Sequence, residues 1–277
     1  MIGMGGSSAL SGFVGVTASE SIAVAIDRRT RRRYAVPTEK RFSKALCTMT
    51  ELVVRASMGT TSAWNQLAPA FTRLTSHKLI VTQESSATFE RTLASNAPAD
   101  LMVLYGEPMN DIVRRGLVLE GSSTIFARAA VGLSVESGAP WPDISTPEAL
   151  KRTLLGAKSI CYSRGGSGGV AARAIEKLGI AEQMKSRIVH SEGGPAAGYV
   201  ARGETEMAIQ QINVSKPIAG TDYVGDLPDE LHEYVVFSIA VMAASREQEA
   251  SRALIRFVTS PQAVPLLQQG MMEPASG

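Results

Sequence analysis

The organisation of this chain is set by residues 158–178, which read KSICYSRGGSGGVAARAIEKL. Residues 158–162 are an apolar run that predicts a buried strand, and residues 170–178 have apolar side chains at helical spacing before Gly179. Between them lies a loop of serines and glycines. Where a strand leads into a helix, unpaired backbone N–H groups and the positive end of the helix dipole converge. The loop therefore predicts an anion site, with a plain tight turn as the alternative.

The loop lacks both common nucleotide-binding motifs. It does not end in Gly-Lys-Ser or Gly-Lys-Thr, and it does not contain Gly-x-Gly-x-x-Gly. ATP and dinucleotides are therefore poor candidates, and we expect no cofactor.

The composition favours layered α/β structure. The chain has 277 residues, of which 44% are hydrophobic and 5% aromatic. This is enough for one large domain or two lobes with apolar cores. Abundant alanine and glycine with few aromatic residues favour α/β layers over an all-β fold.

The positive charge is concentrated near the N-terminus. Residues 1–48 hold eight Lys or Arg and three Asp or Glu, which leaves 20 basic and 23 acidic residues in the rest of the chain, a net charge of −3. A mildly acidic globular part argues against nucleic acid as a partner.

Metal and disulfide chemistry are not expected. Cys47 precedes the periodic pattern and Cys161 lies in a predicted strand, so a disulfide between them is not expected. His77, His190 and His232 are far apart, and no metal-ligating cluster is predicted.

Residues 1–48 differ in composition from the rest of the chain. An apolar stretch at 21–26 precedes the basic run at 28–34, the reverse of the order in a secretory signal, and is too short to span a bilayer. Three interpretations stay open: a disordered or vestigial extension, a basic arm, or residues upstream of a true start at Met49. We prefer the first or the last. No export signal is recognised, which leaves a cytoplasmic location open, and no membrane insertion is expected.

From residue 52 the pattern alternates between strands and helices. Strands are predicted at 52–56, 78–82, 101–105, 158–162, 187–190 and 207–212. Helices are predicted at 62–74, 88–94, 109–116, 147–155, 170–178, 196–202, 248–259 and 261–269. This alternation predicts parallel strands with helices on both faces of a sheet.

Two longer extended segments, at 123–135 and 234–244, interrupt the alternation. A chain that crosses twice between groups of strands and helices predicts two lobes facing a cleft. We expect residues 49–125 with 235–277 to form lobe 1 and residues 126–234 to form lobe 2.

Seven short stretches of the sequence, taken together, match the pattern of a known protein family. They are AS (56–57), WNQLAPAF (64–71), PADLMVL (98–104), PDISTPEALK (142–151), SICYS (159–163), GETEMAIQQI (203–212) and ALIRFVTSP (253–261). Together they resemble the type 2 periplasmic solute-binding proteins, in particular the molybdate-binding-protein-like branch. The resemblance implies a two-lobed fold with two crossing segments as its hinge, a monomer, a small anionic ligand and, as one option, an ABC transporter permease as partner.

The resemblance also implies where a ligand would bind. Members of the family hold an oxyanion with serine hydroxyls and backbone N–H groups at helix N-termini from both lobes. Position by position, the expected ligand-binding residues are Ser57, Ser85, Ser86, Ser163, Arg164, Gly166, Ser167 and Gln210. Ser85 and Ser86 compete for one role, because one of them can be a helix cap alone, and Gln210 can instead join the lobes.

The ligand class is left open between metal oxyanions and organic acids. No clear copy of the residues that fix molybdate is present, and Arg164 adds a guanidinium to the loop. A guanidinium has a planar fork that suits carboxylates. An organic carboxylate is therefore at least as well supported as molybdate.

Three functions are consistent with these features. The leading one is a binding protein without catalytic activity. The second is an isomerase, because some proteins similar to this branch isomerise unsaturated tricarboxylates such as aconitate. That reaction needs a general base, for which Glu107, Glu192 and Tyr105 are the candidates. The third is a sensor that reports an anion to a partner.

Overall fold

The computed structural model describes residues 24–26, 33–35, 49–95, 97–192 and 194–275. The chain divides into two units, Met1–Cys47 and Thr48–Gly277. In the first unit, β1 (Val24–Ile26) pairs antiparallel with β2 (Arg33–Ala35). The rest of residues 1–48 lies outside the part of the chain that the structure describes, and so do the three interpretations given for it. No helix in the described part of the chain is both long and apolar enough to cross a membrane.

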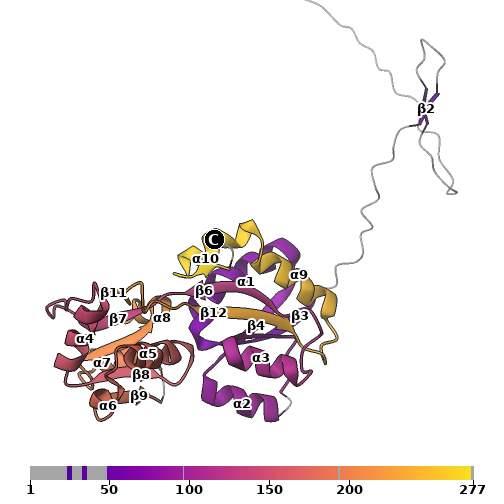
Figure 1. Cartoon of the computed structure of the whole chain (residues 1–277). Helices are drawn as coiled ribbons and strands as arrows, with labels where there is room; N and C mark the ends of the chain where they lie inside the picture. Colours follow the sequence, from indigo (N-terminus) through magenta and orange to yellow (C-terminus); the bar gives the residue numbers. More distant parts are fainter. Residues whose placement is uncertain (1–23, 27–32, 36–48, 96, 193, 276–277) are drawn as a thin grey trace, which may run out of the picture. The chain divides into compact units, whose positions relative to one another are not determined.

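The second unit contains two mixed sheets, each with its own helices, and we call them lobe 1 and lobe 2 (Figure 1). The strand order is β13-β6-β12-β5-β3-β4 in lobe 1 and β11-β7-β10-β8-β9 in lobe 2. The strands of lobe 1 are β3 (Glu51–Ser57), β4 (Lys78–Glu84), β5 (Leu101–Tyr105), β6 (Thr124–Ala129), β12 (Val235–Val241) and β13 (Glu273–Pro274). Its helices are η1 (Met58–Thr60), α1 (Thr61–Thr75), α2 (Ser86–Ala94), α3 (Gly106–Arg114), α9 (Gln248–Val258), η2 (Pro261–Ala263) and α10 (Val264–Gln269).

Lobe 2 is smaller. Its strands are β7 (Val131–Glu136), β8 (Ile160–Ser163), β9 (Ile188–Ser191), β10 (Met207–Gln211) and β11 (Thr221–Asp226). Its helices are α4 (Pro147–Gly156), α5 (Gly166–Lys177), α6 (Ala181–Met184), α7 (Ala196–Ala201) and α8 (Ile212–Ser215).

Helices cover both faces of the lobe 1 sheet, as Figure 1 shows. The central strand β5 divides its side chains between two cores. Leu101 and Val103 pack with residues of α1, α9 and α10, whereas Met102 and Leu104 pack with residues of α2 and α3. Burial on both faces explains why β5 is a continuous apolar run rather than an alternating one.

The expectation of parallel pairing is wrong for the strands that come after the crossings. Strands β3, β4 and β5 are parallel, as are β8, β9 and β10. In contrast, β12 runs antiparallel to β5 and β6, and β7 runs antiparallel to β10. A parallel neighbour requires a crossover connection, usually a helix of the same lobe, and neither β7 nor β12 is preceded by one.

The extended segment predicted at 123–135 is two strands in different sheets. β6 pairs in lobe 1 and β7 pairs in lobe 2, so the first crossing falls at Ala130. The second crossing falls between β11 and β12. Two crossings at neighbouring strands make a hinge of the kind that permits closure around a ligand.

Candidate functional site

The carboxyl ends of three parallel strands meet at one edge of the lobe 1 sheet. Ser57 ends β3, Glu84 ends β4 beside Ser57 in the strand register, and Tyr105 ends β5. A helix follows each strand closely: η1 after β3, α2 after β4 and α3 after β5. Because helix N-termini carry unpaired N–H groups, this edge favours negative charge.

A cavity of about 100 Å³ opens at this edge. It is lined by Ser57, Glu84, Ser85, Phe89, Glu90, Leu104, Tyr105 and Pro108. The structure therefore brings together three residues that the sequence singled out, Ser57, Ser85 and Tyr105, which come from three different strand ends.

Both serines of this cavity are helix caps. The Oγ of Ser57 accepts a hydrogen bond from the backbone N–H of Gly59 at 3.4 Å, and the Oγ of Ser85 accepts one from Thr88 at 3.3 Å. Ser86 is the first residue of α2, which makes Ser85 the cap of the pair. A capping hydroxyl still has its hydrogen to donate, so cap and ligand contact are compatible roles for Ser57. The Ser85 Oγ also lies 3.1 Å from the Thr88 Oγ1, which itself donates to the Ser85 carbonyl oxygen. A ligand that accepts a hydrogen bond from Ser85 therefore has to replace Thr88 as the acceptor.

The loop at 163–168 has a matching geometry in lobe 2. Ser163 ends β8, and its Oγ accepts a hydrogen bond from the backbone N–H of Gly165 at 3.2 Å. A Cβ on Gly168 would lie only 1.5 Å from the carbonyl oxygen of Ser163, so the turn into α5 requires glycine there. Ser167 is buried in the first turn of α5, one turn earlier than the sequence predicted the helix to begin.

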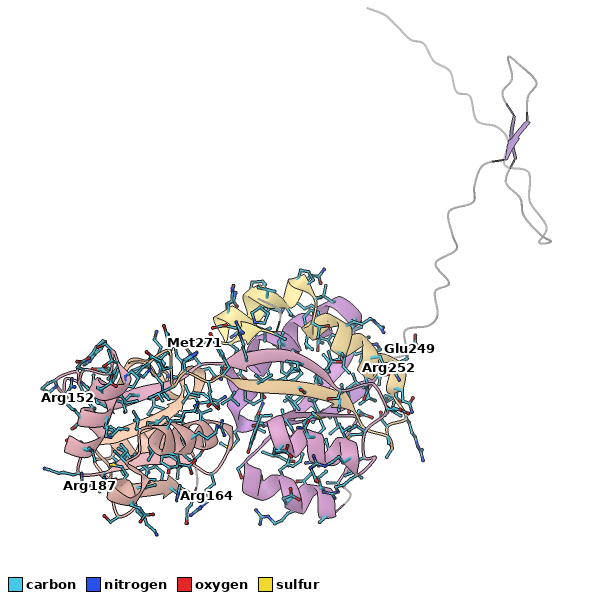
Figure 2. All side chains as sticks on the ribbon, in the orientation of Figure 1. Arg152, Arg164, Arg187, Glu249, Arg252 and Met271 are labelled. Carbon is cyan, nitrogen blue, oxygen red and sulfur yellow. The ribbon has the colours of Figure 1, made fainter. Side chains whose placement is uncertain are left out.

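Arg164 is exposed at the tip of this loop. Figure 2 labels it on lobe 2. Burial raises the pKa of Tyr162, two residues before Arg164, and the positive charge of Arg164 lowers that pKa in part. Burial also raises the pKa of Cys161 to about 12. Both side chains are thus neutral near pH 7, and the positive charge of this loop comes from Arg164.

The two lobes touch beside these loops. The Asn213 Nδ2 donates hydrogen bonds to the carbonyl oxygen of Gly59 at 2.8 Å and to the Ser62 Oγ at 3.0 Å. A Cβ on Gly166 would lie 3.1 Å from a ring carbon of Tyr105. The N-terminus of α5 in lobe 2 therefore lies against the end of β5 in lobe 1.

Three residues selected from the sequence have other surroundings. Gln210 is buried within lobe 2, where its Oε1 accepts a hydrogen bond from the backbone N–H of Ala197 in α7 at 3.2 Å. Glu107 is exposed and forms an ion pair with Arg114. Glu192 is exposed in the loop after β9. None of the three is among the described residues that line the cavity. All of the lining residues belong to lobe 1, so the expected ligand-binding residues of lobe 2 lie outside this cavity as well: Ser163, Arg164, Gly166 and Ser167.

Sequence reasoning missed Glu84. This residue is only 6% exposed, and its Oε1 forms an ion pair of 2.5 Å with the Nη1 of Arg55. Its Oε2 is buried and has no hydrogen-bond partner among the residues that the structure describes. The feature of the sequence that could have identified Glu84 is its position directly before Ser85, a predicted helix cap.

Among the described residues, no group of three His, Cys, Asp or Glu side chains is arranged to hold a metal ion. The chemistry available at the strand ends is that of hydroxyl groups, backbone N–H groups, one tyrosine and one buried carboxylate.

Comparison with known proteins agrees with this architecture. A family model described as bacterial extracellular solute-binding protein matches residues 52–270. A Pseudomonas protein named aconitate isomerase is 31% identical over 234 residues, which cover 82% of this chain and 88% of that protein. A molybdate-binding protein of Azotobacter vinelandii is 22% identical over 223 residues, 78% of this chain and 87% of its own. The solved sulfate-binding protein of Mycobacterium tuberculosis has a TM-score of 0.67 at 20% identity, covering 82% of this chain and 88% of its own.

Proposed function

Since the chain belongs to the family of bacterial extracellular solute-binding proteins, we propose that it binds a small organic anion with two or more carboxylates between its lobes. The observation that carries this proposal is the matched pair of strand-end serines, Ser57 in lobe 1 and Ser163 in lobe 2, each at the entrance to a helical segment. Together with the helix N-termini they supply neutral donors from both sides of one ligand.

The proposed contacts divide between the lobes. Ser57 and Ser85 donate from lobe 1, with the N-terminus of α2, which begins at Ser86. The loop of lobe 2 contributes the hydroxyl of Ser163, the guanidinium of Arg164 and the N–H groups of Gly166 and Ser167. Hydrogen bonds to a charged ligand contribute about 1.5–3 kcal/mol each. Gln210 acts indirectly in this proposal, because its amide holds α7.

One charged group favours carboxylates over metal oxyanions. Arg164 offers the planar fork that a carboxylate fits. Glu84 also lines the cavity, and its Oε2 is buried without a hydrogen-bond partner among the described residues.

Binding would favour the closed arrangement of the lobes. The contacts of Asn213 with Gly59 and of Gly166 with Tyr105 exist when the lobes are together. A ligand that touches both lobes has more contacts in this arrangement and shifts the population toward it. An ABC transporter permease that reads the closed form is the partner that a role in transport would require.

Isothermal titration calorimetry tests this function. The ligands are cis-aconitate, trans-aconitate, citrate and tricarballylate, compared with molybdate, tungstate, sulfate and phosphate. We expect saturable binding of at least one tricarboxylate and none of molybdate. Binding of molybdate or tungstate without any carboxylate, or no binding at all, would contradict the proposal.

A second function, isomerisation of an unsaturated tricarboxylate, is supported by two observations. The relative that is 31% identical is named aconitate isomerase. In addition, a carboxylate that is buried and only half paired is costly to keep and unsuited to passive anion binding. Incubation with trans-aconitate, followed by NMR of the isomer ratio, separates an isomerase from a binding protein.

A further inference from the structure

We infer that the Oε2 of Glu84 is the atom that takes a proton from the bound ligand and returns it. This inference rests on the second function proposed above, and it assigns to Glu84 the general-base role for which the sequence offered Glu107, Glu192 and Tyr105. Three observations carry it: where Glu84 lies, how it is held, and which of its two oxygens is unpaired.

Glu84 lies where a reacting ligand would be bound. It is the last residue of β4, beside Ser57 in the register, and it precedes the capping Ser85. All three residues line the same cavity. A ligand carboxylate held by the two serine hydroxyls would bring its neighbouring carbon atoms close to the carboxylate of Glu84.

Arg55 holds one oxygen of this carboxylate and leaves the other unengaged. Its Nη1 donates to the Oε1 of Glu84 at 2.5 Å, and its Nε donates to the carbonyl oxygen of Pro98 at 2.9 Å. The guanidinium is therefore anchored at both ends, and Arg55 is a positioning residue. A fixed orientation and a second oxygen without a partner leave this carboxylate able to accept a proton from a ligand that comes within hydrogen-bonding reach.

The other acidic side chains fit this role less well. Glu90 lines the cavity but is exposed, and Glu107 is exposed and paired with Arg114. Exposed carboxylates keep their water shells, which a ligand proton donor would have to displace. Glu84 lines the cavity and combines burial with a carboxylate oxygen that has no partner among the described residues.

The reaction balances without any co-reactant. Glu84 removes one proton from the methylene carbon of the tricarboxylate, and the electrons of the broken C–H bond form a new double bond to the central carbon. The former double bond takes up a proton at its terminal carbon. The proton count is unchanged, nothing is oxidised or reduced, and the product has the same constitution with a double bond whose geometry can differ. Donors at the carboxylates stabilise the charge that develops between the two steps.

The test is proton NMR of trans-aconitate in D₂O buffer with the full chain, combined with calorimetric binding. The wild-type protein is expected to interconvert the isomers and to exchange ligand hydrogens for deuterium. Glu84→Gln is expected to slow both processes by about a hundredfold to ten-thousandfold, with the Kd changed less than about fivefold. The control is Glu249→Gln, which replaces an exposed carboxylate of α9 away from the cavity and is expected to keep the wild-type rate.

The possible results distinguish a failure of the role given to Glu84 from a failure of the proposed binding function. If Glu84→Gln isomerises within tenfold of wild type, Glu84 is not the base. If the wild type binds aconitate but neither isomerises it nor exchanges its hydrogens, the inference fails while the binding function stands. If the wild type does not bind, the proposed function itself fails. If Glu84→Gln does not fold, Glu84→Asp is the second variant, because it keeps the negative charge on a side chain that is shorter by one methylene group. We expect this variant to isomerise at least tenfold more slowly than wild type and to retain binding.

Discussion

Ser57 and Ser163 occupy matching positions in the two lobes. Each is the last residue of its strand, and each accepts through Oγ a hydrogen bond from the backbone N–H of the glycine two residues later, at 3.4 and 3.2 Å. The Ser-x-Gly pattern is thus repeated at residues 57–59 and 163–165. We expect both hydroxyl groups to donate to one ligand between the lobes.

Replacement of either serine should weaken binding. We expect Ser57→Ala and Ser163→Ala each to raise the Kd for a tricarboxylate by about tenfold to a hundredfold, because each removes a hydrogen bond to a charged group. Titration calorimetry measures the change. Ser95→Ala is the control, since the Ser95 hydroxyl bonds locally to Thr92 at the exposed end of α2. Unchanged affinity in both variants would remove the serines from the site.

The turn from β8 into α5 should tolerate substitution at one glycine but not at its neighbour. A Cβ on Gly168 would overlap the Ser163 carbonyl oxygen, at 1.5 Å, whereas a Cβ on Gly169 would meet only the flexible end of Arg173 at 3.3 Å. We expect Gly168→Ala to lower the free energy of unfolding by about 3 kcal/mol or more. Gly169→Ala should leave it unchanged or raise it by about 0.5–1 kcal/mol. Urea unfolding compares the two, and equal effects would contradict the packing described for this turn.

Asn213 should control how readily the lobes close. Asn213→Ala removes the hydrogen bonds to Gly59 and Ser62, and we expect the Kd to rise about tenfold, because about 1–2 kcal/mol of contact between the lobes is lost. Small-angle scattering of the unliganded variant should show a larger radius of gyration than wild type. Asn110→Ala, at an exposed position of α3, is the matched control. A variant with wild-type affinity and size would show that Asn213 does not stabilise closure.

Glu233 should stabilise the fold near neutral pH and not in acid. Hydrogen bonds from Arg173 and Lys177 hold the pKa of Glu233 below its ordinary value. A lowered folded-state pKa contributes stability that is present above the unfolded pKa and is lost as the pH falls through the folded pKa. Because the side chain is 30% exposed, the contribution is about 0.5–1 kcal/mol.

The pH dependence of Glu233→Gln checks this assignment. Its free energy of unfolding should fall below that of wild type at pH 7, and the difference should shrink toward pH 3. Glu230→Gln, at an exposed position nearby, should show no such trend. A difference that is constant with pH would mean that the carboxylate is not responsible.

Most of the fold could be predicted because the local patterns are strong. Thr146 and Pro147 predicted the start of a helix, and the Thr146 hydroxyl does accept a hydrogen bond from Ala149 at 3.1 Å. The direction of β12 could not be predicted, because a strand buried on both faces has the same composition in either direction. β11, with sequence TDYVGD, has weak strand propensity and is held in place by pairing with β7.

The site could be predicted only in part, for a related reason. Ser57, Ser85 and Tyr105 follow neighbouring parallel strands, so the pattern alone places them at one edge. The role proposed for Glu84 depends on an ion pair with Arg55, 29 residues earlier, and on the order of the strands in the sheet. Gln210 is subject to the same limit, since the sequence does not tell whether its amide reaches the cleft or α7.

A crystal structure of the protein with trans-aconitate would show directly whether serines of both lobes hold one ligand. We expect electron density for the ligand between the lobes, with carboxylate oxygens within hydrogen-bonding distance of the hydroxyls of Ser57 and Ser163 and with the Oε2 of Glu84 facing a ligand carbon. A ligand bound elsewhere, or bound to one lobe without contact to either serine, would contradict it.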